Sequence, residues 1–216
     1  NISFKIEAGE RVALVGKVGS GKSTVAKLML GLYQPDSGSI LIDGVDSRQI
    51  DSADLRRNIG TVMQDVWLLT GTVKQNIAIG GNNPTDQEIL EASQLAGVHE
   101  FISHHPEGYG LRLKERGEGL SGGQKQSITI ARALVNKPPI VLMDEPTSAM
   151  DLPGERTLIE RLKAELINQT IIVITHRASI IELIDRVLVL DQGKLVAQGP
   201  KSDFMKKPPT PAAPVP

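Results

Sequence analysis

The sequence has no cysteine, almost no net charge and no long apolar run. The absence of cysteine from 216 residues excludes disulfide bonds and thiolate chemistry. A formal net charge of −1, with acidic and basic residues interspersed, argues against nucleic acid as a partner and against a basic membrane-binding face. The longest apolar runs, such as Ile171–Ile174, are of strand length, well below the roughly 20 residues of a membrane span. Any membrane association would therefore come through a partner or through another part of a longer polypeptide.

Short apolar runs predict a layered α/β fold. Most of them are solidly apolar rather than alternating, as expected of strands covered on both faces in a parallel sheet. Helical patterns separate several of these runs, and the chain is long enough for one domain with a sizeable core. The expected strands are residues 11–15, 40–42, 59–63, 140–143, 171–174 and 187–190.

Several local patterns predict helices and a hairpin. Residues 24–30 read as a helix, and Thr85–Glu88 is a capping box that opens another helix, which Gly97 can close. Asp191–Gly193 separates two β-rich runs and predicts a closing hairpin. A further helix carries an apolar stripe formed by Leu158, Ile159, Leu162 and Leu166.

The chain divides into a core, an insertion and a tail. Residues 66–136 hold several helix signals and no convincing core strand, which predicts a helical subdomain inserted into a core made of residues 1–65 and 137–205. Residues 206–216 contain five prolines and few large apolar groups. This composition predicts a disordered tail.

Residues 16–23 read Gly-Lys-Val-Gly-Ser-Gly-Lys-Ser and match the GxxxxGK[ST] phosphate-binding loop. The motif follows an expected strand and precedes an expected helix, which is the context it requires. Glycines let successive backbone N–H groups converge on phosphate oxygens, and the helix adds its unpaired N-terminal donors. Lys22 can bind the β- and γ-phosphates, and the Ser23 hydroxyl can ligate Mg²⁺. The candidate nucleotide-binding residues here are Gly16, Lys17, Val18, Gly19, Ser20, Gly21, Lys22, Ser23 and Thr24.

Two adjacent carboxylates, Asp144 and Glu145, end the apolar run 140–143. In P-loop enzymes an acid at this strand end holds the magnesium shell. Consecutive strand residues face opposite ways, so Asp144 can face Mg²⁺ while Glu145 orients the attacking water. Alone, the pair fits a solvated acidic turn equally well; together with Lys22 it favours catalysis.

Residues 120–124 read Leu-Ser-Gly-Gly-Gln. Ser121 fits a helix N-cap, but two glycines are poor helix formers and indicate a close approach. With this segment the chain resembles the nucleotide-binding domain of ATP-binding cassette (ABC) transporters, whose signature is LSGGQ. The resemblance runs from Asn1 to about Met205. It covers the phosphate loop, Gln64, the signature, Asp144–Glu145, the D-loop at 148–151 and His176, in the family's order.

The resemblance implies an α/β fold with a P-loop NTPase (RecA-like) core, a mainly parallel sheet, an inserted helical subdomain and a small antiparallel β portion. It also implies hydrolysis of ATP with Mg²⁺. Gln64 would contact Mg²⁺ or the lytic water, and His176 would bind the γ-phosphate; without the family, a polar loop residue is the better reading of His176. Two head-to-tail copies would share each ATP through four signature residues and one D-loop residue: Ser121, Gly122, Gly123, Gln124 and Asp151.

A narrower resemblance is to ABC exporters. Glu115–Gly119 is similar to the X-loop of exporters, and Gly71–Ile77 also fits their pattern. Residues 105–110 and 146–151 resemble ATPases of bacterial type I secretion, which export polypeptides. This implies transmembrane domains on the same polypeptide and a position at the cytoplasmic face of the bacterial inner membrane. Drug or lipid export, a soluble ABC ATPase, an importer subunit and a non-hydrolysing regulator are the alternatives.

The N-terminus departs from the family's pattern. Family members place an adenine-stacking aromatic residue well before the phosphate loop, whereas Phe4 is the only aromatic residue before Gly16 and looks like a core strand residue. The chain is therefore expected to be an N-terminally truncated fragment of a longer exporter. Weakened ATP binding and an exposed sheet edge would follow.

Overall fold

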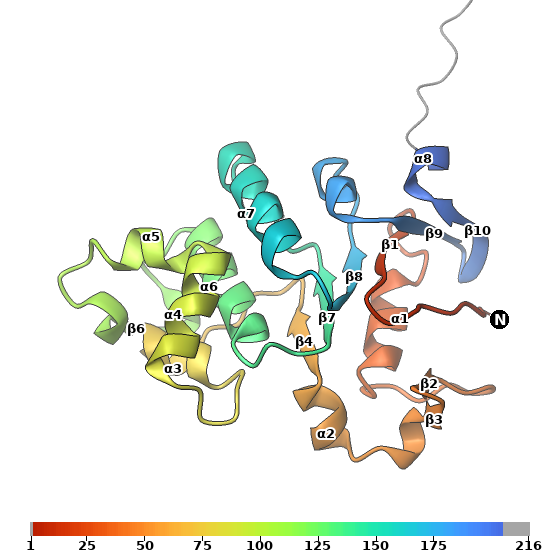
Figure 1. The fold of residues 1–216 in the computed structure, drawn as a ribbon, viewed down its shortest axis with the longest axis horizontal. Coiled ribbons are helices and arrows are strands. Elements are labelled where there is room, and N and C mark those ends of the chain that lie inside the picture. Colours follow the sequence, from red (N-terminus) through yellow and green to blue (C-terminus); the bar gives the residue numbers. More distant parts are fainter. Residues whose placement is uncertain (1, 205–216) are drawn as a thin grey trace, which may run out of the picture.

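The computed structural model describes residues 2–204, and a six-stranded sheet forms its centre (Figure 1). The strand order is β10-β9-β1-β8-β7-β4, and all neighbouring pairs are parallel except β9 and β10. The strands are β1 (Arg11–Val15), β4 (Ile59–Val62), β7 (Ile140–Asp144), β8 (Thr170–Ile174), β9 (Arg186–Asp191) and β10 (Lys194–Pro200). The expected α/β fold with a mainly parallel sheet is confirmed.

Apolar side chains alternate between the two faces of the sheet and bury both. On β1, Val12 and Leu14 join the cluster beneath α1 (Lys22–Met29) and α2 (Ser52–Arg57). Ala13 points to the opposite cluster, which includes residues of α6 (Gly122–Leu134) and α7 (Leu152–Glu165). Burial on both faces is what the continuous apolar runs predict.

The expected strand at residues 40–42 is present, but it lies outside the central sheet. Instead β2 (Leu41–Ile42) pairs only with β3 (Val45–Asp46) in a separate two-stranded hairpin. Asp43 and Gly44 have φ values of +49° and +81°, as a tight hairpin turn requires. The turn ends β2 after two residues and brings β3 back beside it, so β2 pairs with β3 rather than with a strand of the central sheet.

Between β4 and β7 the chain is mainly helical. The two strands of this stretch, β5 (Gly71–Thr72) and β6 (Arg112–Leu113), pair with each other outside the central sheet. Its other helices are α3 (Val73–Ala78), α4 (Asp86–Ala96) and α5 (Val98–Ile102). The Thr85–Glu88 capping box is present, and Gly97 ends α4 in a left-handed conformation. The treatment of residues 66–136 as a separate subdomain stays a prediction.

The C-terminal part follows the local patterns closely. Gln192 and Gly193, with φ values of +45° and +72°, form the turn between β9 and β10. The short helix α8 (Lys201–Phe204) comes next. The expected disordered tail at 206–216 lies outside the described residues. Within residues 2–204 no helix is both long and apolar enough to cross a bilayer.

The N-terminal segment corrects one expectation. Phe4 is half-buried against the cluster beneath α1, but residues 2–10 form no strand. Phe4 therefore contributes to the core from an extended loop rather than from a strand.

Candidate functional site

The phosphate-binding loop joins the C-terminal end of β1 to the start of α1. The helix begins at Lys22, two residues before the predicted start, and Gly21 precedes it with φ at +100°. A Cβ at Gly16 would lie 2.1 Å from the Leu190 carbonyl oxygen of β9. Only glycine allows this approach, which holds the loop against the neighbouring strand. Lys17 and Val18 at the loop's tip are exposed.

The Lys22 ammonium folds back over the loop. Its Nζ donates to the Gly16 carbonyl oxygen at 2.8 Å and to the Lys17 carbonyl oxygen at 2.9 Å. It also lies 3.4 Å from the Ser20 hydroxyl. A cation is thus held at the centre of a glycine-rich turn, which suits binding of phosphate oxygens.

Ser23 and Asp144 meet although they lie 121 positions apart in the sequence. The Ser23 hydroxyl donates to Asp144 Oδ2 at 2.9 Å. Asp144 ends β7 and is 2% exposed. A hydroxyl beside a buried carboxylate is an all-oxygen ligand pair of the kind that Mg²⁺ prefers. The residues present therefore fit a magnesium ion.

Burial raises the pKa of Asp144, and the neighbouring Glu145 charge raises it further. The hydrogen bond from Ser23 and the more distant charge of Lys22 act in the opposite direction but do not cancel the rise. The ionised carboxylate is thus incompletely compensated, and a bound divalent cation would stabilise it.

Glu145 and His176 form a close pair at the adjacent strand ends. His176 follows β8, and its Nδ1 lies 2.7 Å from Glu145 Oε1. Glu145 has φ at +50°, and its N–H donates to the Ile174 carbonyl oxygen at 2.8 Å. Left-handed backbone is strained for a glutamate, and such strain often accompanies a functional site. The turn directs the Glu145 carboxylate toward the residues that follow β8.

Gln64 lies at the same edge of the sheet. It is exposed and follows the end of β4 by two residues, and β4 runs parallel to β7 with Val62 opposite Met143. The C-terminal ends of four parallel strands thus carry Gln64, Asp144–Glu145, His176 and the phosphate loop. This is the edge at which ligands bind in open α/β sheets.

The signature segment occupies another part of the molecule. Ser121 caps α6, with its hydroxyl accepting from the Gln124 N–H at 3.2 Å while Gln124 Oε1 accepts from the Ser121 N–H at 2.9 Å. A Cβ at Gly122 would lie 3.1 Å from the Ala149 Cβ. The segment therefore packs against residues 148–151. Figure 1 shows α6 and α1 on opposite sides of β7 and β8.

Asp151 is the N-cap of α7. Its Oδ1 accepts from the Gly154 N–H at 3.0 Å. Asp151 is also exposed to solvent. Its predicted contact with a second copy of the chain stays a prediction.

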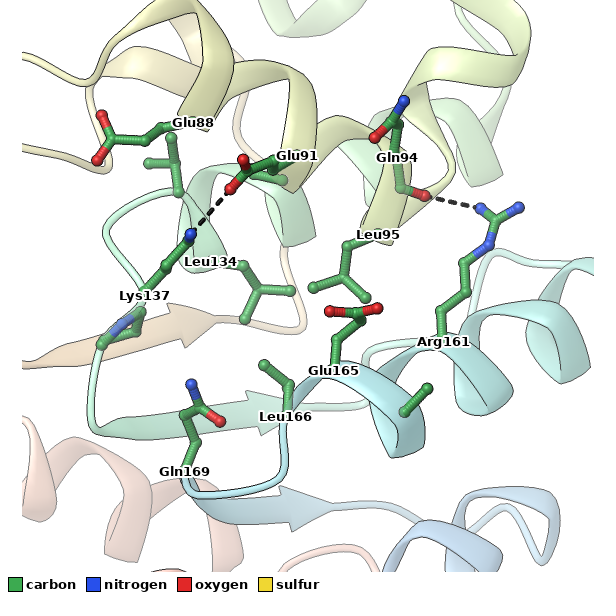
Figure 2. A pocket seen from close by; sticks show the side chains of 14 residues that line it. Glu88, Glu91, Gln94, Leu95, Leu134, Lys137, Arg161, Glu165, Leu166 and Gln169 are labelled. Carbon is green, nitrogen blue, oxygen red and sulfur yellow. Dashed lines mark hydrogen bonds and ion pairs between the residues drawn. The ribbon is translucent and has the colours of Figure 1, made fainter.

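A groove on the surface is separate from these residues. It has a volume of about 570 Å³ and lies between α4, the end of α6 and α7 (Figure 2). The Glu91–Lys137 ion pair and Arg161 line it, with Leu134 at its base. None of the candidate nucleotide-binding residues lines it.

Four residues that the sequence did not single out form a polar cluster beside Glu145 and His176. Glu155 accepts from Thr147, Arg177 and Ser179. A glutamate in the first turn of a helix is ordinary, so no local pattern distinguishes Glu155. Only the contacts across the fold reveal it.

Comparison with known proteins gives a consistent result. Residues 1–148 match the model of the family described as ABC transporter. The leukotoxin export ATP-binding protein LtxB of Aggregatibacter actinomycetemcomitans is 42% identical over 95% of this chain and 29% of its own length. The putative multidrug export ATP-binding/permease protein YgaD of Bacillus subtilis is 43% identical over 95% of this chain and 35% of its own length.

A solved structure agrees with these sequences. A bacterial Atm1-family ABC exporter with ATP bound superposes with a TM-score of 0.90 at 43% identity, covering 94% of this chain and 36% of that one. The chain thus spans about a third of the length of the proteins it matches.

Proposed function

Because this chain belongs to the ABC transporter family, we propose that it is the ATP-binding and ATP-hydrolysing motor domain of an exporter. The observation that carries the proposal is the Glu145–His176 pair, whose atoms lie 2.7 Å apart at the sheet edge that also bears the phosphate loop. A base and a polar partner beside a phosphate site are the parts that hydrolysis of a phosphoanhydride needs.

Each residue of the site would have a separate role in ATP hydrolysis. Lys22 and the N–H groups of the loop bind the β- and γ-phosphates, and the Glu145 carboxylate accepts the proton of a water aligned with the γ-phosphorus. His176 donates a hydrogen bond to a γ-phosphate oxygen. The water's oxygen forms the new bond to phosphorus as the bond to the leaving ADP breaks, so positioning and charge supply the catalysis. Mg²⁺, held by Ser23, Asp144 and Gln64, would neutralise phosphate charge.

A second copy of the chain would complete each site. The signature residues Ser121, Gly122 and Gly123 begin α6, and α6 lies on the opposite side of β7 and β8 from α1 (Figure 1). They therefore suit an ATP held by another copy better than their own. The N-terminus of a helix such as α6 favours binding of an anion, as a phosphate group of that ATP would be. Asp151, exposed at the start of α7, would lie at the same interface.

Transmembrane domains are the second proposed partner. Trp67 and Leu69, which follow Gln64, are 58% and 56% exposed, and the Arg116 guanidinium lies 4.8 Å from the centre of the Trp67 ring. An exposed apolar group beside the segment that resembles an exporter X-loop suits a protein contact. The greater length of the relatives supports membrane domains on the same polypeptide, with this domain at the cytoplasmic face.

The cargo is proposed to be a polypeptide, as in type I secretion. The leukotoxin export relative and the similarity at residues 105–110 and 146–151 support this. Export of a drug or lipid is the second candidate, because the multidrug export relative is equally similar.

Replacement of Glu145 by Gln tests the proposal. The amide cannot accept the proton, so the ATPase rate should fall by about 10²- to 10⁴-fold, while ATP binding is retained and ATP-bound dimers accumulate in gel filtration. The matched control is Glu160→Gln, an exposed position on α7, which should turn over normally. Native turnover by the Glu145 variant would contradict its role as the base.

A further inference from the structure

A buried carboxylate outside the predicted site holds three segments together. Glu155, in the first turn of α7, is 0% exposed. Its Oε1 accepts from the Thr147 hydroxyl at 2.8 Å and from the Ser179 hydroxyl at 2.6 Å. Its Oε2 accepts from Arg177 at 2.8 Å. A buried charge with every oxygen satisfied is kept in one geometry, because breaking the set leaves it unpaired.

The donors come from the two segments that flank the proposed catalytic pair. Thr147 follows Glu145 by two residues, and Arg177 directly follows His176. The Arg177 guanidinium also donates to the Ser148 carbonyl oxygen at 3.1 Å. Glu155 and Arg177 therefore join the end of β7 and the residues after β8 to the segment 148–151, which packs against the signature glycines.

His176 has few other supports. Its side chain is 75% exposed, so packing does not fix the ring. On one side, the Thr175 hydroxyl lies 3.4 Å from Glu145 Oε2. On the other, the Arg177 N–H donates to the Thr175 hydroxyl at 3.0 Å while the Arg177 side chain reaches Glu155. The position of the His176 ring therefore depends on the hydrogen bonds of the residues on either side of it, Thr175 and Arg177.

We infer that Glu155 is a positioning residue: through Arg177 it holds His176 against Glu145 and ties both to the segment 148–151. The inference rests on the proposed function and extends it, because a second copy that displaces residues 148–151 would shift His176. Contact of a second copy with residues 148–151 would then change the position of His176, the residue proposed to bind the γ-phosphate. Glu155 itself does not touch the nucleotide.

The first experiment reads His176 directly in the 216-residue chain, without requiring turnover. The chain has four histidines, so the His176 ring signal in an NMR spectrum can be assigned with a His176→Gln variant. Glu155→Gln should shift and broaden the His176 signal and leave those of His99, His104 and His105 unchanged. Glu160→Gln, the exposed control on the same helix, should leave all four unchanged.

The second experiment measures ATP hydrolysis. Glu155→Gln should lower kcat by ~10- to 100-fold, as expected for a displaced catalytic group, with KM within about twofold because phosphate binding is untouched. Arg177→Gln should have the same effect, and the double variant should lose no more than either alone, since both act through one contact. Additive losses would overturn the inference.

Failure of the inference and failure of the proposed function give different results. An unchanged His176 signal in folded Glu155→Gln overturns the inference even if the wild-type chain hydrolyses ATP. Native turnover by Glu145→Gln contradicts the proposed function, while the NMR result still decides the role of Glu155. If Glu155→Gln does not fold, Arg177→Gln decides, because Arg177 is partly exposed; an undisturbed His176 there overturns the inference.

Discussion

Individual residues of this chain are fixed by contacts that allow little substitution. Gly16 is an example in the phosphate loop, because its backbone passes so close to the Leu190 carbonyl oxygen that a Cβ atom would not fit. Glu155 shows it in the interior, where a single carboxylate satisfies three donors. In both cases the side chain, or its absence, sets the geometry of a neighbouring functional segment.

Gly16→Ala should disable the phosphate loop. The new methyl group would lie 2.1 Å from the Leu190 carbonyl oxygen and 2.7 Å from the Ser20 hydroxyl, so the loop must move. We expect the free energy of unfolding to fall by about 1–3 kcal/mol and ATP binding to be lost in a fluorescence titration. Gly19→Ala meets no atom within 4 Å but has φ at +80°, so it should cost only about 1 kcal/mol. Equal affinities for the two variants would contradict the argument.

Replacement of Glu155 should change stability in a pH-dependent way. Burial alone would raise its pKa, but hydrogen bonds from Ser179, Thr147 and Arg177 lower it below the ordinary value of 4.5. A depressed pKa stabilises the fold above that value, and the contribution is lost as the pH falls through the folded-state pKa. Glu155→Gln should therefore lower the free energy of unfolding by about 1–3 kcal/mol at pH 7. In urea titrations the difference from wild type should shrink below pH 4.5; a pH-independent difference would disprove this.

At the scale of elements, helix starts serve both stability and function. Capping boxes begin α3, α4 and α6. The box of α6 is also the signature segment, so Ser121 has two proposed tasks: capping its own helix and contacting an ATP held by a second copy. A matched pair of cap removals separates them.

Ser121→Ala and Thr85→Ala should destabilise the fold equally but affect catalysis differently. Each removes a hydroxyl that accepts from the third helical N–H, at 3.2 Å in α6 and 3.3 Å in α4. Each should lower the free energy of unfolding by about 1 kcal/mol. Only Ser121→Ala should also lower the ATPase rate, because only that hydroxyl lies in the proposed shared site. A rate that falls equally in both variants would assign the effect to stability.

At the scale of the whole molecule, the proposed catalytic parts are divided. The phosphate loop, Asp144, Glu145 and His176 share one sheet edge, whereas the signature segment lies beyond β7 and β8 with α6 (Figure 1). Under the proposed function, a single copy would therefore present two half-sites rather than one complete site. The groove of Figure 2, between α4 and α7, belongs to neither half.

The ATPase rate per molecule should therefore depend on protein concentration. If two copies complete each site, the specific rate measured with Mg²⁺ should rise with concentration and level off as dimers dominate. Mixing wild type with excess Glu145→Gln should change the wild-type rate, because mixed dimers form. A specific rate that stays constant and nonzero down to nanomolar protein would contradict a shared site.

The sequence by itself determined the features that depend on neighbouring residues. The phosphate loop, the capping box at Thr85, the Gln192–Gly193 turn and five runs of the central sheet follow from backbone preferences and hydrogen bonds within a few positions. The family was evident for the same reason, since its motifs are short and continuous. These elements appear where predicted, within one or two residues.

The tertiary structure decided which distant segments meet. The Ser23 hydroxyl donates to Asp144 across 121 positions, and Glu155 accepts from donors in two loops. The strand Leu41–Ile42 pairs with Val45–Asp46 outside the central sheet. Such contacts depend on the order of the strands and on how helices pack against them, because only this arrangement brings side chains far apart in the sequence together. A pattern within a few neighbouring residues therefore does not predict these contacts.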